Sequence, residues 1–88
     1  MLYEEAEALA YEVRDDIKRL PALHGLVKYD QIAECSTDST SQMYYRPPNW
    51  CVSVVVLDDT RLPALLHTRA EWARFKGQLL GRWLESTR

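Results

Sequence analysis

The chain has 88 residues, of which 47% are hydrophobic and 10% aromatic, so it can fold as one domain, residues 1–88, with a real core. Its net charge of −2 argues against a protein that binds nucleic acid mainly by neutralising phosphates. The charge is unevenly spread, because residues 1–20 and 21–60 each carry −3 whereas residues 61–88 carry +4.

The N-terminal run and the cysteine content point to an intracellular protein. Met1 is followed by an acidic amphipathic run rather than by the basic and apolar regions of a secretory signal. The longest apolar run, Val54–Leu57, is far too short to cross a membrane. Cys35 and Cys51 are too few for a disulfide framework, so we expect a cytoplasmic protein with two free thiols. A Cys35–Cys51 disulfide across paired strands is the alternative.

Residues 2–20 are predicted to form the first helix. Acidic residues occupy its first turns, and Lys18 and Arg19 its last, as the helix dipole favours. Pro21 ends the helix at Leu20, and a turn is expected at His24-Gly25. The apolar residues at helical spacing are Leu2, Ala6, Leu9, Val13, Ile17 and Leu20.

Two strands are predicted in the middle of the chain. Residues 26–35 alternate loosely, and the face with Val27, Tyr29, Gln31, Ala33 and Cys35 is the more apolar, so we expect it to face inward. A helix over residues 29–35 is the competing interpretation. Residues 36–42 are entirely polar and predict a mobile loop. Residues 51–57 are mostly β-branched, which indicates a strand buried on both faces.

A short third strand and a long helix complete the predicted fold. Residues 62–67 suggest the strand, and Thr68 and Glu71 form a capping box at the start of the helix. Trp72, Phe75, Leu79 and Trp83 follow at helical spacing and are expected to supply much of the core. The predicted class is α+β, a two-layer domain with the order helix, strand, strand, short strand, helix, in which both helices cover an antiparallel sheet.

No residue constellation predicts catalysis. The sequence lacks a nucleophile elbow and a glycine-rich phosphate loop, and adjacent Asp58 and Asp59 suit a turn better than acid–base work. His24, His67, Cys35 and Cys51 are the only soft metal ligands, and their spacing matches no known ligand pair. We therefore expect a non-enzymatic protein with no metal and no cofactor.

Two surfaces are candidates for binding. The segment around Pro47 and Pro48, together with the outer face of the last helix, is typical of a protein-contact surface, although its aromatic residues could equally pack under the sheet edge. The same side chains could instead stack on bases and contact phosphates, which makes a nucleic-acid module the alternative. The candidate contact residues are Tyr44, Tyr45, Arg46, Trp50, Arg69, Arg74 and Arg82.

A stripe of small residues on the last helix is the second candidate. Ala70, Ala73, Gly77 and Gly81 lie on one face beside Leu84, and two mid-helix glycines are costly unless another backbone approaches closely. The approaching element is either the first helix of the same chain or the same stripe of a second subunit. Because a domain this small buries its surface incompletely, we expect a homodimer by a narrow margin over a monomer.

Part of the sequence resembles a known family. The run Pro63-x-Leu65-x-His67-Thr68-x-x-Glu71-Trp72-x-x-Phe75 and the strand Cys51-Val52-x-Val54 are similar to motifs of the BldB-like domain-of-unknown-function family of actinobacteria. In that family an aromatic residue stands where this chain has His67. The resemblance implies a small regulatory protein rather than an enzyme. We therefore expect a regulator or adaptor that acts through protein–protein contacts, with no membrane association.

Overall fold

A computed structural model of the chain describes residues 1–35, 49–57 and 63–86. It contains helices α1 (Tyr3–Arg19) and α2 (Pro21–His24), strands β1 (Val27–Glu34), β2 (Trp50–Val56) and β3 (Ala64–Leu66), and helix α3 (Arg69–Ser86). The strands form one antiparallel sheet in the order β1-β2-β3. The predicted α+β class is confirmed.

Helix α1 ends where the sequence predicts, and a short helix follows it. Leu20 has an extended backbone (φ −106°, ψ 100°), because proline at the next position disfavours the helical region. Its N–H still bonds to the Asp16 carbonyl, at 2.9 Å. Pro21 then starts α2, a single turn ending at His24, since proline is pre-organised for the first position of a helix. The residues between the first helix and the predicted turn at His24-Gly25 are therefore helical.

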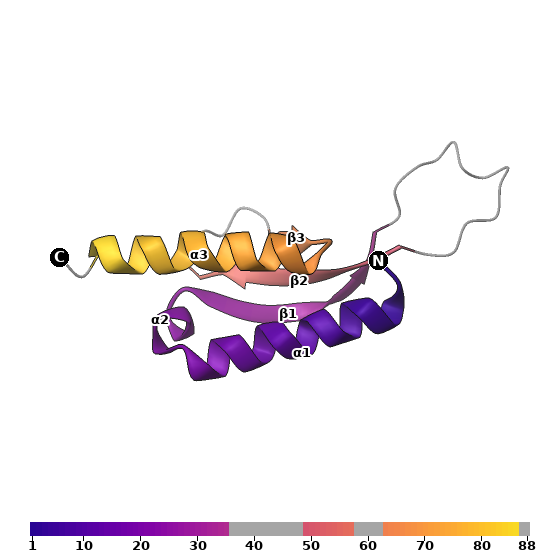
Figure 1. The fold of residues 1–88 in the computed structure, drawn as a ribbon, viewed down its shortest axis with the longest axis horizontal. Coiled ribbons are helices and arrows are strands. Elements are labelled where there is room, and N and C mark those ends of the chain that lie inside the picture. Colours follow the sequence, from indigo (N-terminus) through magenta and orange to yellow (C-terminus); the bar gives the residue numbers. More distant parts are fainter. Residues whose placement is uncertain (36–48, 58–62, 87–88) are drawn as a thin grey trace, which may run out of the picture.

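Both long helices lie on the same face of the sheet. Figure 1 shows α1 running beside β1 and α3 beside β2 and β3. Trp72 and Leu79 of α3 share one core with Leu9 and Val13 of α1 and with Val54 of β2. The expected coupling of the two helices through a common core is confirmed.

One aromatic residue does not join that core. Trp72 is 1% exposed and Phe75 is half-buried, but Trp83 is 40% exposed. The C-terminal part of α3, the part of the helix that contains Trp83, extends past the ends of the strands (Figure 1). The prediction that Trp83 is a core residue was therefore wrong.

Strand β1 carries an irregularity that changes which side chains face the helices. Tyr29 pairs with Val54 and Gln31 with Ser53, so Asp30 is an extra residue in the ladder. Its carboxylate accepts a hydrogen bond from the Ser53 hydroxyl, at 3.3 Å. After this bulge Ile32, not Gln31, packs against the core. The predicted inward face was right for Val27 and Tyr29, and wrong for Gln31, Ala33 and Cys35.

The second face of the sheet carries no helix of the described chain. Alternation along the paired strands puts Lys28, Gln31, Ala33, Cys51, Ser53, Val55 and Leu65 on that face. The central residues Cys51 and Ser53 are nevertheless buried, because they are short and flanked on both sides by neighbouring strands. The expectation that β2 is buried on both faces holds for residues 51–54.

Candidate functional site

A groove lies where α1, α2 and the edge strand β1 meet. Its volume is about 430 Å³, which is within the range of small-ligand pockets. The residues that line it are Arg14, Ile17, Lys18, His24, Val27, Lys28, Tyr29 and Leu57. All three neighbouring elements contribute, so the groove depends on the break that Leu20 and Pro21 impose between α1 and α2.

The groove combines an apolar lining with cations. Ile17, Val27 and Leu57 supply aliphatic surface, and Leu57 is 49% exposed. Arg14 is held over the Tyr29 ring, with its guanidinium carbon 4.1 Å from the ring centroid. Lys18, from the next turn of α1, adds a second positive charge. Lys28 of β1 also lines the groove, although alternation along the strand turns its side chain toward the uncovered face.

His24 is tied to the backbone of α1 at the end of this groove. Its Nε2 lies 3.1 Å from the Lys18 carbonyl oxygen. Because a carbonyl oxygen can only accept, the imidazole donates through Nε2 and keeps Nδ1 unprotonated when it is neutral. The contact anchors α2 against the last turns of α1.

The contact residues expected from the sequence do not line this groove. Tyr44, Tyr45 and Arg46 lie outside the described residues. Trp50 begins β2, is half-buried, and packs edge-on against Tyr3 with ring centroids 5.0 Å apart. Trp50, the described aromatic residue of the expected contact surface, is therefore partly covered by α1.

The basic residues expected on α3 are exposed, and Arg69 forms an ion pair within the chain. Arg69 Nε lies 2.9 Å from Glu12 Oε2, so part of the acidic-to-basic polarity of the sequence is used inside one subunit. Arg74 and Arg82 are both exposed. All three lie on α3, away from the groove lining of α1, α2 and β1.

The small-residue stripe of α3 faces solvent. Ala70, Ala73, Gly77 and Gly81 are all exposed, and Leu84 is 56% exposed. A Cβ atom on Gly77 or Gly81 would meet no atom of another element within 4 Å. The interpretation in which α1 of the same chain packs closely on this stripe is therefore wrong.

Asp16 is the buried ionisable group that joins the two long helices. Its carboxylate accepts hydrogen bonds from Trp72 Nε1 at 2.8 Å, Lys76 Nζ at 2.9 Å and Arg19 Nη2 at 2.7 Å. Burial raises its pKa, but the hydrogen bonds from Trp72, Lys76 and Arg19 outweigh burial and lower the pKa to about 2. This carboxylate is saturated by its partners and serves the structure rather than a ligand.

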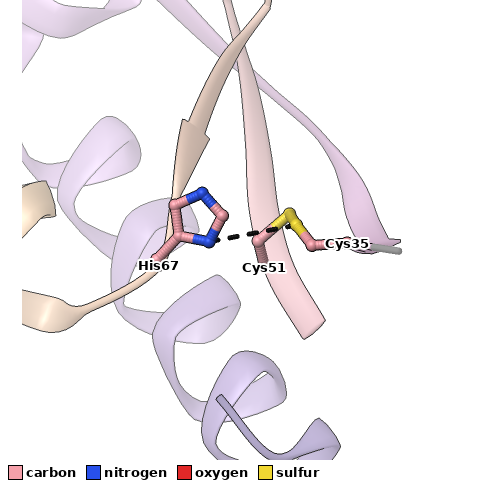
Figure 2. Close-up of side chains that lie close together, drawn as sticks. All are labelled: Cys35, Cys51 and His67. Carbon is pink, nitrogen blue, oxygen red and sulfur yellow. Dashed lines mark hydrogen bonds between the residues drawn. A yellow bond between two sulfur atoms is a disulfide. The ribbon is translucent and has the colours of Figure 1, made fainter. Parts of the chain in front are cut away.

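The two cysteines are joined by a disulfide, which corrects the expectation of two free thiols. Cys35 follows β1 directly and Cys51 lies in β2, with their Cα atoms 6.3 Å apart. His67 follows β3, and its Nδ1 lies 3.9 Å from Cys35 Sγ. Figure 2 shows the three side chains converging from the ends of the three strands.

This row of three side chains was not visible in the sequence. The two sulfurs and one imidazole nitrogen lie within 4.8 Å of one another, and no other such metal-capable group occurs within residues 1–35, 49–57 and 63–86. His24, the fourth soft candidate, lies at the α2 end of the molecule. Cys35 and Cys51 are 16 positions apart in the sequence, and so are Cys51 and His67, so only the pairing of the strands brings the three residues together.

Comparison of the chain with protein-family models, with curated proteins and with solved structures gives no match. None of the helices in the described part of the chain combines the length and the apolar character needed to cross a bilayer.

Proposed function

We propose that this chain is a non-catalytic regulatory or adaptor protein whose groove between α1, α2 and β1 binds an acidic, amphipathic segment of a protein partner. The observation that carries the proposal is the composition of the groove. Aliphatic side chains lie beside Arg14 and Lys18 in one concave surface, which Lys28 of the edge strand also lines. A segment with both apolar and carboxylate side chains complements both features.

The arrangement of the cations favours a protein segment over a purely apolar ligand. Arg14 is oriented by the Tyr29 ring, so little side-chain freedom is lost when it pairs with a carboxylate. Charges of one sign around a concave surface also speed up association and select the partner. Asp58 and Asp59 follow Leu57 in the sequence and lie outside the described residues, so the positive character of the groove is that of its described residues.

A photo-crosslinking experiment tests the proposal. A photoreactive residue replaces either Leu57, in the groove, or Leu65, on the uncovered sheet face. Position 65 is the matched control for position 57, because Leu57 is 49% exposed and Leu65 is 48% exposed. We expect position 57 to capture a protein from host lysate, and Lys18→Glu with Lys28→Glu to abolish that capture. Equal capture at position 65, or capture that survives the charge reversal, would contradict the proposal.

The nucleic-acid alternative has weaker support. Its basic face would use Arg69, Arg74 and Arg82, and Arg69 is already paired with Glu12. Binding to DNA or RNA that falls steeply between low and moderate salt would favour this alternative over the protein partner. An absence of binding at low salt would end it.

We also propose that the chain forms a homodimer through the small-residue stripe of α3. The open backbone at Gly77 and Gly81 supports this, because two helices with glycines in contact can approach closely. Exposed Leu84 beside the stripe adds apolar surface to such an interface.

Sedimentation of Gly77→Leu and Gly81→Leu variants tests the dimer. A Cβ atom at either site meets no atom of another element in its own subunit, and both sites are exposed, so the variants should remain folded. We expect them to sediment as monomers while wild type sediments as a dimer. Gln78→Leu, on the exposed surface off the stripe, is the control that adds the same side chain. A wild type that is monomeric at tens of micromolar would rule the dimer out.

We place the protein in the cytoplasm as part of the same proposal. In that compartment the thiol pool keeps most cysteine pairs reduced. The Cys35–Cys51 disulfide would then be one of two states of the pair rather than a permanent cross-link.

A further inference from the structure

We propose that Cys35, Cys51 and His67 form a three-ligand site for Zn²⁺ when the disulfide is reduced. The site stands apart from the groove and from the small-residue stripe, and it does not depend on the function proposed above. Its basis is the convergence of two sulfurs and an imidazole nitrogen from three neighbouring strands (Figure 2).

The distances suit tetrahedral coordination. Zinc bonds of about 2.3 Å to sulfur and about 2.0 Å to nitrogen hold a sulfur and a nitrogen about 3.5 Å apart. His67 Nδ1 is 3.9 Å from Cys35 Sγ, and all three ligand atoms lie within 4.8 Å of one another. Reduction lets the two sulfurs separate to about 3.8 Å, the spacing that tetrahedral zinc requires. Rotation of the cysteine side chains supplies that change.

The backbone at each ligand is held in place by hydrogen bonds. The Cys35 N–H bonds to the Asn49 carbonyl at 2.7 Å, which ties the end of β1 to the start of β2. The His67 N–H donates to Glu71 Oε2 at 2.8 Å, so the cap of α3 fixes the residue that follows β3. Cys51 is fully buried in the central strand. The ligands are therefore pre-organised before any ion binds.

The chemistry of the three donors selects a soft or borderline ion. Two thiolates and one neutral imidazole match zinc, and a set of three protein ligands leaves a fourth position for water or an external ligand. Binding through Nδ1 requires the His67 ring to carry its proton on Nε2. The sheet face at this point carries no helix in the described chain, and Cys35 and His67 are half-buried whereas Cys51 is fully buried.

Reduction and metal binding are coupled in a defined order. A dithiol or two monothiols supply two electrons and two protons, the S–S bond breaks, and the reductant becomes a disulfide. Zn²⁺ then replaces the two thiol protons, which are released to solvent. The oxidised protein, whose sulfurs are bonded to each other, lacks the two thiolates and should not bind the ion.

Titration of the full-length protein with Zn²⁺ alone tests the site. The protein is reduced with a phosphine, and zinc affinity is measured by competition with a chromophoric chelator. We expect one ion per chain, and with Co²⁺ as a probe the absorption of a tetrahedral complex with thiolate ligands. The oxidised protein should not remove Zn²⁺ from the chelator.

Variants of the two histidines provide the matched comparison. His67→Ala keeps the backbone N–H that donates a hydrogen bond to Glu71 Oε2, so the cap of α3 should survive. We expect His67→Ala and Cys35→Ser to lower zinc affinity by more than the roughly 10–100-fold that loss of an outer-shell partner costs. His24→Ala, at the opposite end of the sheet, should leave affinity unchanged. Circular dichroism checks that each variant is folded, and His67→Ala decides the question if Cys35→Ser unfolds.

Three results would overturn the site. One is a reduced wild type that leaves the chelator loaded at micromolar zinc. Another is a stoichiometry of one ion per two chains, which would mean that separate subunits share the metal. The third is an equal loss of affinity in His24→Ala and His67→Ala, which would mean that binding is adventitious.

Discussion

Asp16 shows how one side chain can determine the contact between two helices. It lies on α1 between the core residue Val13 and the half-buried Ile17, with its side chain 5% exposed. Two of its three hydrogen-bond donors, Trp72 and Lys76, belong to α3. Burying the carboxylate is costly, and the cost is offset because all three donors are present.

The lowered pKa of Asp16 predicts a defined pH dependence of stability. Its pKa is about 2 in the folded chain against its usual 3.8, so the folded state binds this proton less readily than the unfolded state. The ionised form therefore stabilises the fold above about pH 4, and this contribution is lost as the pH falls through 2. We expect a contribution on the order of 1–2 kcal/mol, reduced by solvent around Arg19.

Urea denaturation of Asp16→Asn between pH 2 and 7 tests this dependence. The variant should lose about 2–4 kcal/mol at neutral pH, because Trp72 and Lys76 lose a charged acceptor. It should also lose most of the pH dependence below 4. Asp15→Asn is the control, since the Asp15 side chain is 64% exposed and pairs with Arg19 on the surface of the same helix. Similar effects from both substitutions would contradict the role assigned to Asp16.

The role of Asp16 could not be predicted from the sequence. Helical spacing placed the centre of the apolar face of α1 correctly, because Ala6, Leu9 and Val13 are all fully buried, but it was wrong for Leu2, which precedes the helix and is 55% exposed. The same spacing gives no reason to bury a carboxylate. Its donors Trp72 and Lys76 are 56 and 60 residues away, so the burial depends on tertiary packing alone.

At the scale of the element, the start of α3 was predictable because its determinants are local. The Glu71 N–H donates to Thr68 Oγ1 at 3.0 Å, as a capping box requires. The Glu71 carboxylate accepts from the N–H of His67 rather than from that of Thr68. In contrast, the bulge at Asp30 depends on Ser53 in the partner strand, so alternation within β1 could not reveal it.

The end of α3 yields a prediction that compares two tryptophans. Trp72 is 1% exposed and its ring contacts Phe75, whereas Trp83 is 40% exposed beyond the sheet. Truncating a buried large aromatic costs roughly 3–5 kcal/mol, a large share of the stability of a small domain. Trp72→Ala should therefore abolish cooperative unfolding, while Trp83→Ala should cost about 1 kcal/mol or less.

Thermal melts followed by circular dichroism distinguish the two positions. Trp72→Phe separates the lost hydrogen bond to Asp16 from the lost volume, because it keeps an aromatic ring but no donor. We expect Trp72→Phe to lie between wild type and Trp72→Ala in stability. If Trp72→Ala melts within a few degrees of wild type, the assignment of Trp72 to the buried core is wrong.

At the scale of the whole molecule, strand order explains why the Cys35–Cys51–His67 row was missed. Sequence spacing identifies metal or disulfide partners only when they lie close together along the chain. Here the sheet pairs Ala33 with Cys51, and Val52 with Leu66, which sets the ends of the three strands side by side. The strands themselves were predictable from their composition, but their register was not, since β1 contains the bulge at Asp30.

The disulfide gives the last prediction, on the stability of the whole domain. Cys35 and Cys51 are 16 positions apart, and closing a loop of about this length stabilises a fold by about 3 kcal/mol through the unfolded state. A domain of 88 residues has little stability to spare, so reduction should lower its urea midpoint substantially. The measurement uses a phosphine together with a chelator, because a bound metal ion would restore part of the lost stability.

The Cys35→Ser, Cys51→Ser double variant is the control for that measurement. It should unfold near the midpoint of the reduced wild type, and its midpoint should not respond to the phosphine. Withdrawing the chelator and adding Zn²⁺ should then raise the midpoint of the reduced wild type but leave that of the double variant unchanged. A reduced wild type as stable as the oxidised one would mean that the segment between the two cysteines is already restricted in the unfolded chain, so that the cross-link contributes nothing to the fold.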